Sequence, residues 1–141
     1  MGMKVLIDTN VLIDFYGKRP QFYDAAEKIM ELCMEKKIDG GIAAHSVTNA
    51  FYILRKDMPL DLRRSTLKDL CAITTVIGID SEKLVSALDN KAFSDVEDCL
   101  QSECAKRFSA SHIITRNIKD FEHSDVPAIL PDDFLKNVLG I

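Results

Sequence analysis

The sequence predicts an α/β fold in which helices cover both faces of a central parallel sheet, a three-layer α/β/α sandwich. Short apolar runs rich in β-branched residues alternate with amphipathic segments along the chain, and strands separated by helices pair in parallel. The length of 141 residues fits a single domain. We place this domain at residues 3–141, on the interpretation that Met3 is the natural start.

The first predicted element is a buried strand, Lys4–Asp8, because its consecutive apolar residues suit a strand covered on both faces. Thr9 or Asn10 can cap the helix that follows, which runs to about Tyr16. Residues 21–37 carry apolar side chains at intervals of three and four positions and therefore form an amphipathic helix.

The next segment is predicted as a strand followed by two helices. Residues 39–41, Asp-Gly-Gly, should end the preceding helix, and a short second strand is expected at residues 41–44. The helices at residues 46–56 and 60–72 form a hairpin because Pro59 interrupts the helical pattern between them.

Two further helices follow the third strand, which is expected at residues 74–79. Asp80 or Ser81 can cap the first of these helices. The second begins where Ser94 and Glu97 form a capping-box pattern, and a buried apolar stripe continues along it.

The C-terminal part completes the sheet. We expect the fourth strand at residues 112–115 and a last strand at residues 128–130. Pro131 begins the final helix, with acidic residues in its first turn.

Composition and charge narrow the class of protein. With 47% hydrophobic and 28% charged residues, the chain is neither disordered nor a collagen-like repeat. Its apolar runs are far shorter than the roughly 20 residues that span a bilayer, and Asp8 and Asp14 interrupt any signal peptide. We therefore expect a cytoplasmic protein with no membrane partner. The net charge of −4 argues against binding nucleic acid by bulk electrostatics alone.

The cysteines form no C-x-x-C pair and have no histidine at zinc-finger spacing. We expect all of them to be reduced, buried thiols. They are Cys33, Cys71, Cys99 and Cys104.

Acidic and amide side chains gather where the predicted strands end. Asp8 follows the first strand, and Asn117 and Asp120 follow the fourth. Ligands of open α/β sheets bind outside the carboxyl ends of the strands. Asp95 and Asp98 lie three positions apart and share one face of their helix. Oxygen ligands from separate segments are typical of a site for Mg²⁺ or Mn²⁺, although each residue could instead be a helix cap or a turn residue.

Four stretches, ordered along nearly the whole chain, combine into one pattern. They are D-T-N-V-L-I-D at residues 8–14, F-Y-I-L-R-K at 51–56, D-V-E-D-C-L-Q at 95–101 and I-T-R-N-I-K-D-F at 114–121. Together they closely resemble the PIN domain family. The resemblance implies a nuclease fold that uses Mg²⁺ or Mn²⁺, and many small stand-alone relatives are VapC-type toxins that cut RNA.

The implied function is therefore a metal-dependent endoribonuclease that hydrolyses single-stranded or structured RNA. It would be the toxin of a toxin–antitoxin pair, with an antitoxin protein as its partner and a homodimeric state. The implied mechanism is phosphodiester hydrolysis by a metal-activated water.

The resemblance also implies roles for individual residues. Asp8 matches the first family acid and Asp98 the third, while Asp95 is an accessory acid, so these carboxylates would hold the metal. Thr115 and Asn10 would support the site. The implied catalytic set consists of Asp8, Asp95, Asp98, Asn49, Asn117 and Asp120.

The second family acid is the point of departure, because Asn49 occupies the position usually held by Glu or Asp. An amide oxygen can ligate weakly but brings no charge to a divalent ion. Asn117 is likewise neutral where many members have an acid. The alternative is therefore a degenerate PIN domain that binds RNA or a protein partner without cutting it.

Substrate approach requires positive charge. Arg55 and Lys56 on the helical hairpin, and Arg116 beside the site, are candidate contacts for substrate phosphates. The competing interpretation is that the hairpin is an ordinary solvated surface, since no aromatic platform for single strands accompanies it.

Other enzyme classes of similar size fit less well. A receiver-type phosphoacceptor domain needs an acidic pair after the first strand, where this chain has the single Asp8. Haloacid-type phosphatases need Asp-x-Asp, and residues 8–10 read Asp-Thr-Asn. Glycine-rich nucleotide loops are absent from the sequence.

Overall fold

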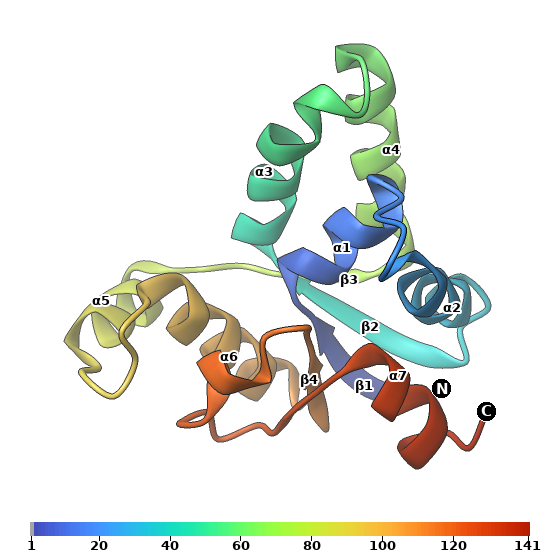
Figure 1. Ribbon diagram of the computed structural model, residues 1–141. Helices are drawn as coiled ribbons and strands as arrows, with labels where there is room; N and C mark the ends of the chain where they lie inside the picture. The colour runs from blue at the N-terminus through green and yellow to red at the C-terminus, as the bar shows by residue number, and fades with distance from the viewer. Residues whose placement is uncertain (1) are drawn as a thin grey trace.

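A fully parallel sheet of five strands, in the order β3-β2-β1-β4-β5, forms the middle of the protein in the computed structural model, which describes residues 2–141 (Figure 1). The strands are β1 (Met3–Ile7), β2 (Ile38–Ala43), β3 (Thr75–Ile77), β4 (His112–Ile114) and β5 (Ala128–Ile129). The predicted three-layer architecture is confirmed.

Helices cover both faces of the sheet. One face packs against α1 (Thr9–Tyr16), α2 (Tyr23–Met34), α4 (Leu60–Ile73) and the C-terminal α7 (Pro131–Asp133) with η3 (Phe134–Val138). The other face packs against α6 (Val96–Phe108), which in turn contacts α5 (Ser81–Asp89). Successive side chains of a β-strand point to opposite faces of the sheet. In β1, Val5 and Ile7 therefore belong to the core under α1 and α2, and Leu6 belongs to the core under α6.

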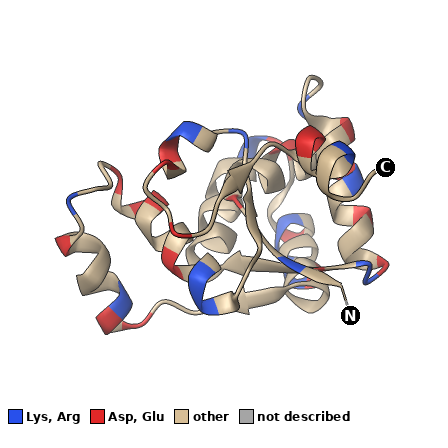
Figure 2. Cartoon of the chain, turned by 90° about the horizontal axis from the view of Figure 1, so that it is seen from below, with Lys and Arg blue, Asp and Glu red and all other residues tan. Residues whose placement is uncertain are grey.

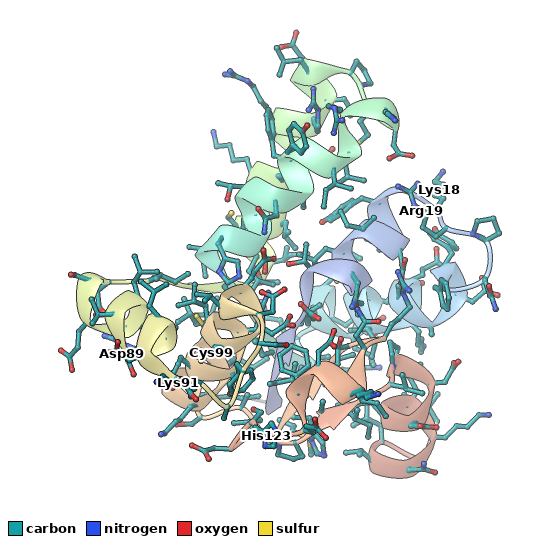
Figure 3. The ribbon with its side chains drawn as sticks, turned by 60° about the vertical axis from the view of Figure 1, so that its left-hand side comes forward. Lys18, Arg19, Asp89, Lys91, Cys99 and His123 are labelled. Atoms are coloured by element: carbon teal, nitrogen blue, oxygen red, sulfur yellow. The ribbon has the colours of Figure 1, made fainter. Side chains whose placement is uncertain are left out.

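The predicted helical hairpin is confirmed. It consists of α3 (Ala44–Ile53), the short η1 (Leu54–Lys56) and α4, and it projects away from the sheet in Figure 1. Arg19, on the loop after α1, holds this hairpin through two hydrogen bonds of 2.8 and 3.1 Å to the carboxylate of Asp57. Figure 3 shows Arg19 on the opposite side of the molecule from Asp89 and Lys91, which lie where α5 leads into α6.

Helix and strand boundaries differ from the prediction at one informative place. Asp39, Gly40 and Gly41 do not end a helix but lie inside β2, and of these only Gly41 also belongs to the predicted strand at residues 41–44. The cause is close packing, because a Cβ atom at Gly40 would lie 2.6 Å from the Cys33 sulfur of α2. One at Gly41 would lie 2.7 Å from the Phe108 ring of α6. The two glycines therefore let a helix approach each face of β2.

We expect the substitution Gly41→Ala to lower the free energy of unfolding by about 1–3 kcal/mol, because the new methyl group overpacks a filled core. Besides Phe108, the added carbon would lie 2.9 Å from Cδ1 of Ile77. Gly78→Ala is the matched control, since nothing lies within 4 Å of a Cβ there. Urea denaturation of both variants checks the prediction, and equal midpoints would contradict it.

Two helix caps also differ from the prediction. Asp8, rather than Thr9 or Asn10, is the N-cap of α1. Asp95, rather than Ser94, is the N-cap of α6. Each cap carboxylate accepts a backbone N–H from its own helix, as an aspartate in this position commonly does. The cap of α5 by Asp80 is as predicted.

The cysteines are free thiols, as expected, but only Cys33, Cys99 and Cys104 are buried. Cys99, labelled in Figure 3, belongs to a small buried cluster with Ala87 of α5 and Leu100. Cys71 is exposed on α4, so the expectation of burial was wrong there: the buried positions of that helix are Leu67 and Leu70.

Charged residues are spread over the helices and loops around the sheet, with acidic and basic residues interspersed (Figure 2). This distribution agrees with the small negative net charge of the sequence. Among residues 2–141, no helix is both long enough and apolar enough to cross a bilayer.

Candidate active site

The parallel strands β1, β2 and β4 end at the same edge of the sheet, and polar side chains follow each of them. Asp8 comes after β1, Ser46 lies in the first turn of α3 after β2, and Thr115 comes after β4. The backbone N–H of Asp8 donates to the carbonyl of Ile114 at 3.0 Å, which fixes the ends of β1 and β4 beside each other. This edge is where open α/β sheets place their ligand sites.

The carboxylate of Asp8 is buried, since only 7% of this residue is exposed, and it accepts hydrogen bonds from three donors. The Thr115 hydroxyl donates to Oδ2 at 2.8 Å, and Nδ2 of Asn10 donates to the same oxygen at 3.3 Å. The backbone N–H of Thr9 donates to Oδ1 at 2.8 Å. These contacts fix the orientation of a buried carboxylate, and two of them come from the side chains of Thr115 and Asn10.

The chain after β4 is fastened to the start of α1. Oδ1 of Asn10 accepts the backbone N–H of Arg116 at 3.3 Å. The hydroxyl of Thr115 accepts the backbone N–H of Asn117 at 3.0 Å. The side chain of Asn117 itself is exposed, so its backbone, not its amide, is what the described contacts use.

A buried hydrogen-bond network lies beneath this edge. Nε2 of Gln101 donates to the Ser46 hydroxyl at 2.6 Å and to the Thr9 hydroxyl at 3.2 Å, and Thr9 donates to Ser46 at 2.8 Å. The three side chains come from α6, α3 and α1 and are all buried. The network therefore fixes the mutual positions of the helices that carry the site.

Acidic side chains at the start of α6 face Asp8. Asp95 caps the helix by accepting the backbone N–H of Glu97 at 2.8 Å, and Asp98 lies one turn further, half-buried. Glu97 extends toward α3, where its Oε1 accepts a hydrogen bond of 2.8 Å from Nδ2 of Asn49. Asp120, on η2 (Ile118–Phe121), is exposed.

Burial raises the pKa of Asp8, and hydrogen bonds from Thr115 and Thr9 offset this only in part. The charges of Glu97 and Asp120 raise it further. The pKa of Asp98 is also raised, to about 7. Burial is the largest cause, followed by the charges of the carboxylates around it. Those carboxylates are Asp95, Asp120, Asp8 and Glu97. The acids from three segments thus form one electrostatic group.

In the metal-free protein we expect stability to fall as the pH rises from about 4 to about 7. The pKa of Asp98 is 3.8 in the unfolded chain and about 7 in the folded protein. Between these values the native state binds more protons than the unfolded state, so its stability relative to the unfolded state falls as the pH rises. Asp98→Asn should flatten this dependence and give a more stable protein above pH 7. Thermal unfolding across the pH range in a chelator checks this, and an unchanged slope would contradict it.

This group of acids lacks basic partners. No lysine or arginine among residues 2–141 forms an ion pair with Asp8, Asp95, Glu97, Asp98 or Asp120. The donor set therefore fits a hard divalent cation in charge and in ligand type. Within the described part of the chain, however, no three His, Cys, Asp or Glu side chains converge closely enough to enclose one ion.

The imidazole of His45, a group that can bind metal ions when neutral, lies in the first turn of α3 at the same edge. Both ring nitrogens are buried and have no hydrogen-bond partner among residues 2–141. Burial lowers the pKa of His45, while Glu97 raises it in part, so the ring lies within reach of the charge on Glu97. Sequence reasoning did not find this residue, because a histidine after a short strand has no signature of its own.

Arg116 is paired with Asp14 and, within residues 2–141, forms no ion pair with the acidic group. Its Nε and Nη2 donate to the carboxylate of Asp14 at 2.6 and 3.2 Å, and its guanidinium lies over the Phe22 ring at 4.1 Å. Asp14 is 1% exposed. The guanidinium is therefore committed to a buried carboxylate, a structural role that the sequence did not reveal.

The other two predicted substrate contacts lie on the projecting hairpin rather than at the acidic group. Arg55 and Lys56 are exposed on η1. The Arg55 guanidinium stacks on the ring of Tyr52 at 4.0 Å and donates to the Tyr52 carbonyl at 2.9 Å. The structure brings together the acids and their supporting residues and leaves these basic residues apart.

The family model of the PIN domain matches residues 4–119. The chain belongs to the PIN domain family. This confirms the family inferred from the sequence motifs. The matched range contains all the predicted site residues except Asp120.

Among curated proteins, this PIN domain is 25% identical over 137 residues to Ribonuclease VapC1 of Aquifex aeolicus (strain VF5), covering 93% of this chain and 92% of that protein. Solved structures of low sequence identity share its fold. A toxin–antitoxin complex from Klebsiella pneumoniae has a TM-score of 0.66 at 22% identity, covering 90% of this chain and 97% of the other. VapBC2 from Rickettsia felis, bound to a DNA fragment from its promoter, has a TM-score of 0.65 at 19% identity, and the match covers 91% of this chain and 98% of the other.

Proposed function

We propose that this PIN domain is a metal-dependent endoribonuclease and the toxin of a toxin–antitoxin pair. The observation that carries the proposal is the buried Asp8 carboxylate, oriented by Thr115 and Asn10 and facing the acids of α6. Its similarity to a protein named Ribonuclease VapC1 supports RNA as the substrate. The toxin–antitoxin complex and the VapBC structures among its structural relatives support an antitoxin partner.

Asp8, Asp98 and Asp95 would hold Mg²⁺ or Mn²⁺, and Asn49, Asn117 and Asp120 would position waters or substrate around it. When bound, such a cation lowers the pKa of a water and neutralises charge on the phosphate. Thr115 and Asn10 keep the Asp8 carboxylate in one orientation. The acids repel one another and a phosphodiester alike, which is why the proposal includes a cation.

The same proposal includes a homodimer and an antitoxin. Apolar side chains lie exposed on two surfaces that could serve these partners: Tyr52, Ile53, Leu60 and Leu62 on the hairpin, and Leu84, Val85 and Leu88 on α5. Exposed apolar side chains that lie together are typical of interaction surfaces. Sedimentation of the purified chain, alone and with its antitoxin, measures both assemblies.

A second candidate function is binding of RNA or a protein partner without cleavage. Asn49 favours it, because this amide stands where the family has an acid and its Nδ2 is already bonded to Glu97. The neutral side chain of Asn117 removes another charge from the site.

The test is cleavage of single-stranded RNA by purified protein with Mn²⁺, Mg²⁺ or chelator. We expect weak cleavage that Mn²⁺ supports and the chelator stops. Asp98→Ala, prepared in the same way, controls for contaminating nuclease and should be inactive. RNA binding without metal-dependent cleavage and without Mn²⁺ binding would favour the second function and overturn the first.

A further inference from the structure

Asn49 and Glu97 form a contact that neither the family pattern nor the proposed mechanism explains. They lie on α3 and α6, 48 positions apart in the sequence, and Nδ2 of Asn49 donates to Oε1 of Glu97 at 2.8 Å. Asn49 is the position where the family usually has its second acid. The chain therefore has a carboxylate directly beside the place where one is missing, supplied by another helix.

Glu97 is well placed to act in the site. It immediately precedes Asp98 on the first turn of α6, and its backbone N–H is held by the cap carboxylate of Asp95. Its charge raises the pKa of Asp8, Asp98 and His45, three groups that follow or face the ends of different strands. Its place in the first turn of α6, beside Asp98, and its bond to Asn49 put Glu97 at the same end of that helix as the predicted metal ligands.

The hydrogen bond also leaves ligating capacity on Glu97. Asn49 engages Oε1, and within residues 2–141 no donor bonds to Oε2. A carboxylate has about four lone-pair sites, so one hydrogen bond orients the group and leaves the second oxygen for a cation. Asn49, for its part, presents its donor side to Glu97, so its carbonyl oxygen stays available as an acceptor.

A purely structural tie between α3 and α6 is a poor explanation of this contact. The bond itself is exposed, with Glu97 exposed and Asn49 half-buried, and an exposed hydrogen bond contributes little to stability because water can replace a partner. The two helices are already joined nearby by the buried bond between Gln101 and Ser46.

We propose that Glu97, oriented by Asn49, supplies the carboxylate that α3 lacks, and so takes the place of the second family acid toward the divalent cation. Glu97 acts on the cation directly, and Asn49 is a positioning residue. This inference rests on the proposed function, because it concerns the ligands of that same site.

The experiment measures Mn²⁺ binding by calorimetry in the purified protein, together with thermal unfolding in chelator and RNA cleavage. Glu97→Gln keeps an oxygen that can accept from Asn49 but removes the charge. We expect it to weaken Mn²⁺ binding about 10- to 100-fold, and Asn49→Ala to weaken it about tenfold, the range typical when groups around a metal site are removed. Metal-free melting temperatures should not fall.

The exchange variant Asn49→Glu/Glu97→Gln moves the acid back to α3 and should recover Mn²⁺ binding and cleavage, which a structural tie would not. Glu103→Gln, on the same helix but outside the acidic group, is the matched control and should bind Mn²⁺ like the natural protein. If the natural protein binds Mn²⁺ and Glu97→Gln binds it equally well, this inference alone is overturned. If the natural protein binds no Mn²⁺, the proposed function is overturned with it.

Discussion

Replacing Asp8 with asparagine should abolish RNA cleavage, with a loss of at least about a thousandfold. The substitution removes the negative charge at the centre of the site, and charge stabilisation by a held metal is worth several kcal/mol, at about 1.4 kcal/mol for each tenfold change in rate. Asparagine has nearly the same size and shape as aspartate, and burial already disfavours the charged form of Asp8. The variant should therefore remain folded.

The measurement is the initial rate of cleavage of a labelled single-stranded RNA in Mn²⁺, with melting temperatures recorded in parallel. Asp132→Asn, an exposed acid in the first turn of α7, is the control and should cleave at the natural rate. If Asp8→Asn retained a tenth of the natural cleavage rate, Asp8 would not be a catalytic residue.

The second large effect concerns stability. We expect Arg116→Met to lower the free energy of unfolding by about 3 kcal/mol, because it leaves Asp14 buried without its partner. Breaking a buried ion pair costs about 3–5 kcal/mol, and the lower end applies because 31% of the Arg116 side chain is exposed. Urea denaturation measures the change.

A double variant separates the ion pair from simple loss of packing. Asp14→Asn/Arg116→Met removes both charges and should recover much of the lost stability. Arg107→Met is the control, because its pair with Asp80 is 62% and 55% exposed, and exposed pairs contribute about 0–1 kcal/mol. If Arg116→Met and Arg107→Met were equally stable, the pair with Asp14 would not be a structural anchor.

The sequence predicted the order of strands and helices because hydrophobic periodicity reports burial directly. It failed where Gly40 and Gly41 were expected to end a helix, because both lie within β2, although Gly41 was also the first residue of the predicted strand. What decides their conformation is the approach of Cys33 and Phe108 from the helices on either face. No local pattern contains that information.

The same distinction applies to the candidate site. Asp8 and Asp98 could be named from the sequence because each follows a recognisable element and belongs to a motif. Arg116 and Asp14 could not be paired, because they are 102 positions apart and both carry charges that are ordinarily solvated. Glu97 was assigned only to a helix cap, and its contact with Asn49 emerges only when α3 and α6 are placed together.

The hydrogen bond from Thr115 to Asp8 joins residues that are 107 positions apart, and this has a consequence for the synthesis of the protein. Domains fold as units while chains emerge, so a chain that ends before β4 has β1 but lacks the hydroxyl that orients Asp8. The acids of α6 and the residues after β4 are likewise made late. A chain that is still being translated and has not reached β4 therefore lacks the assembled candidate site, and the proposed cleavage activity requires that β4 has been made.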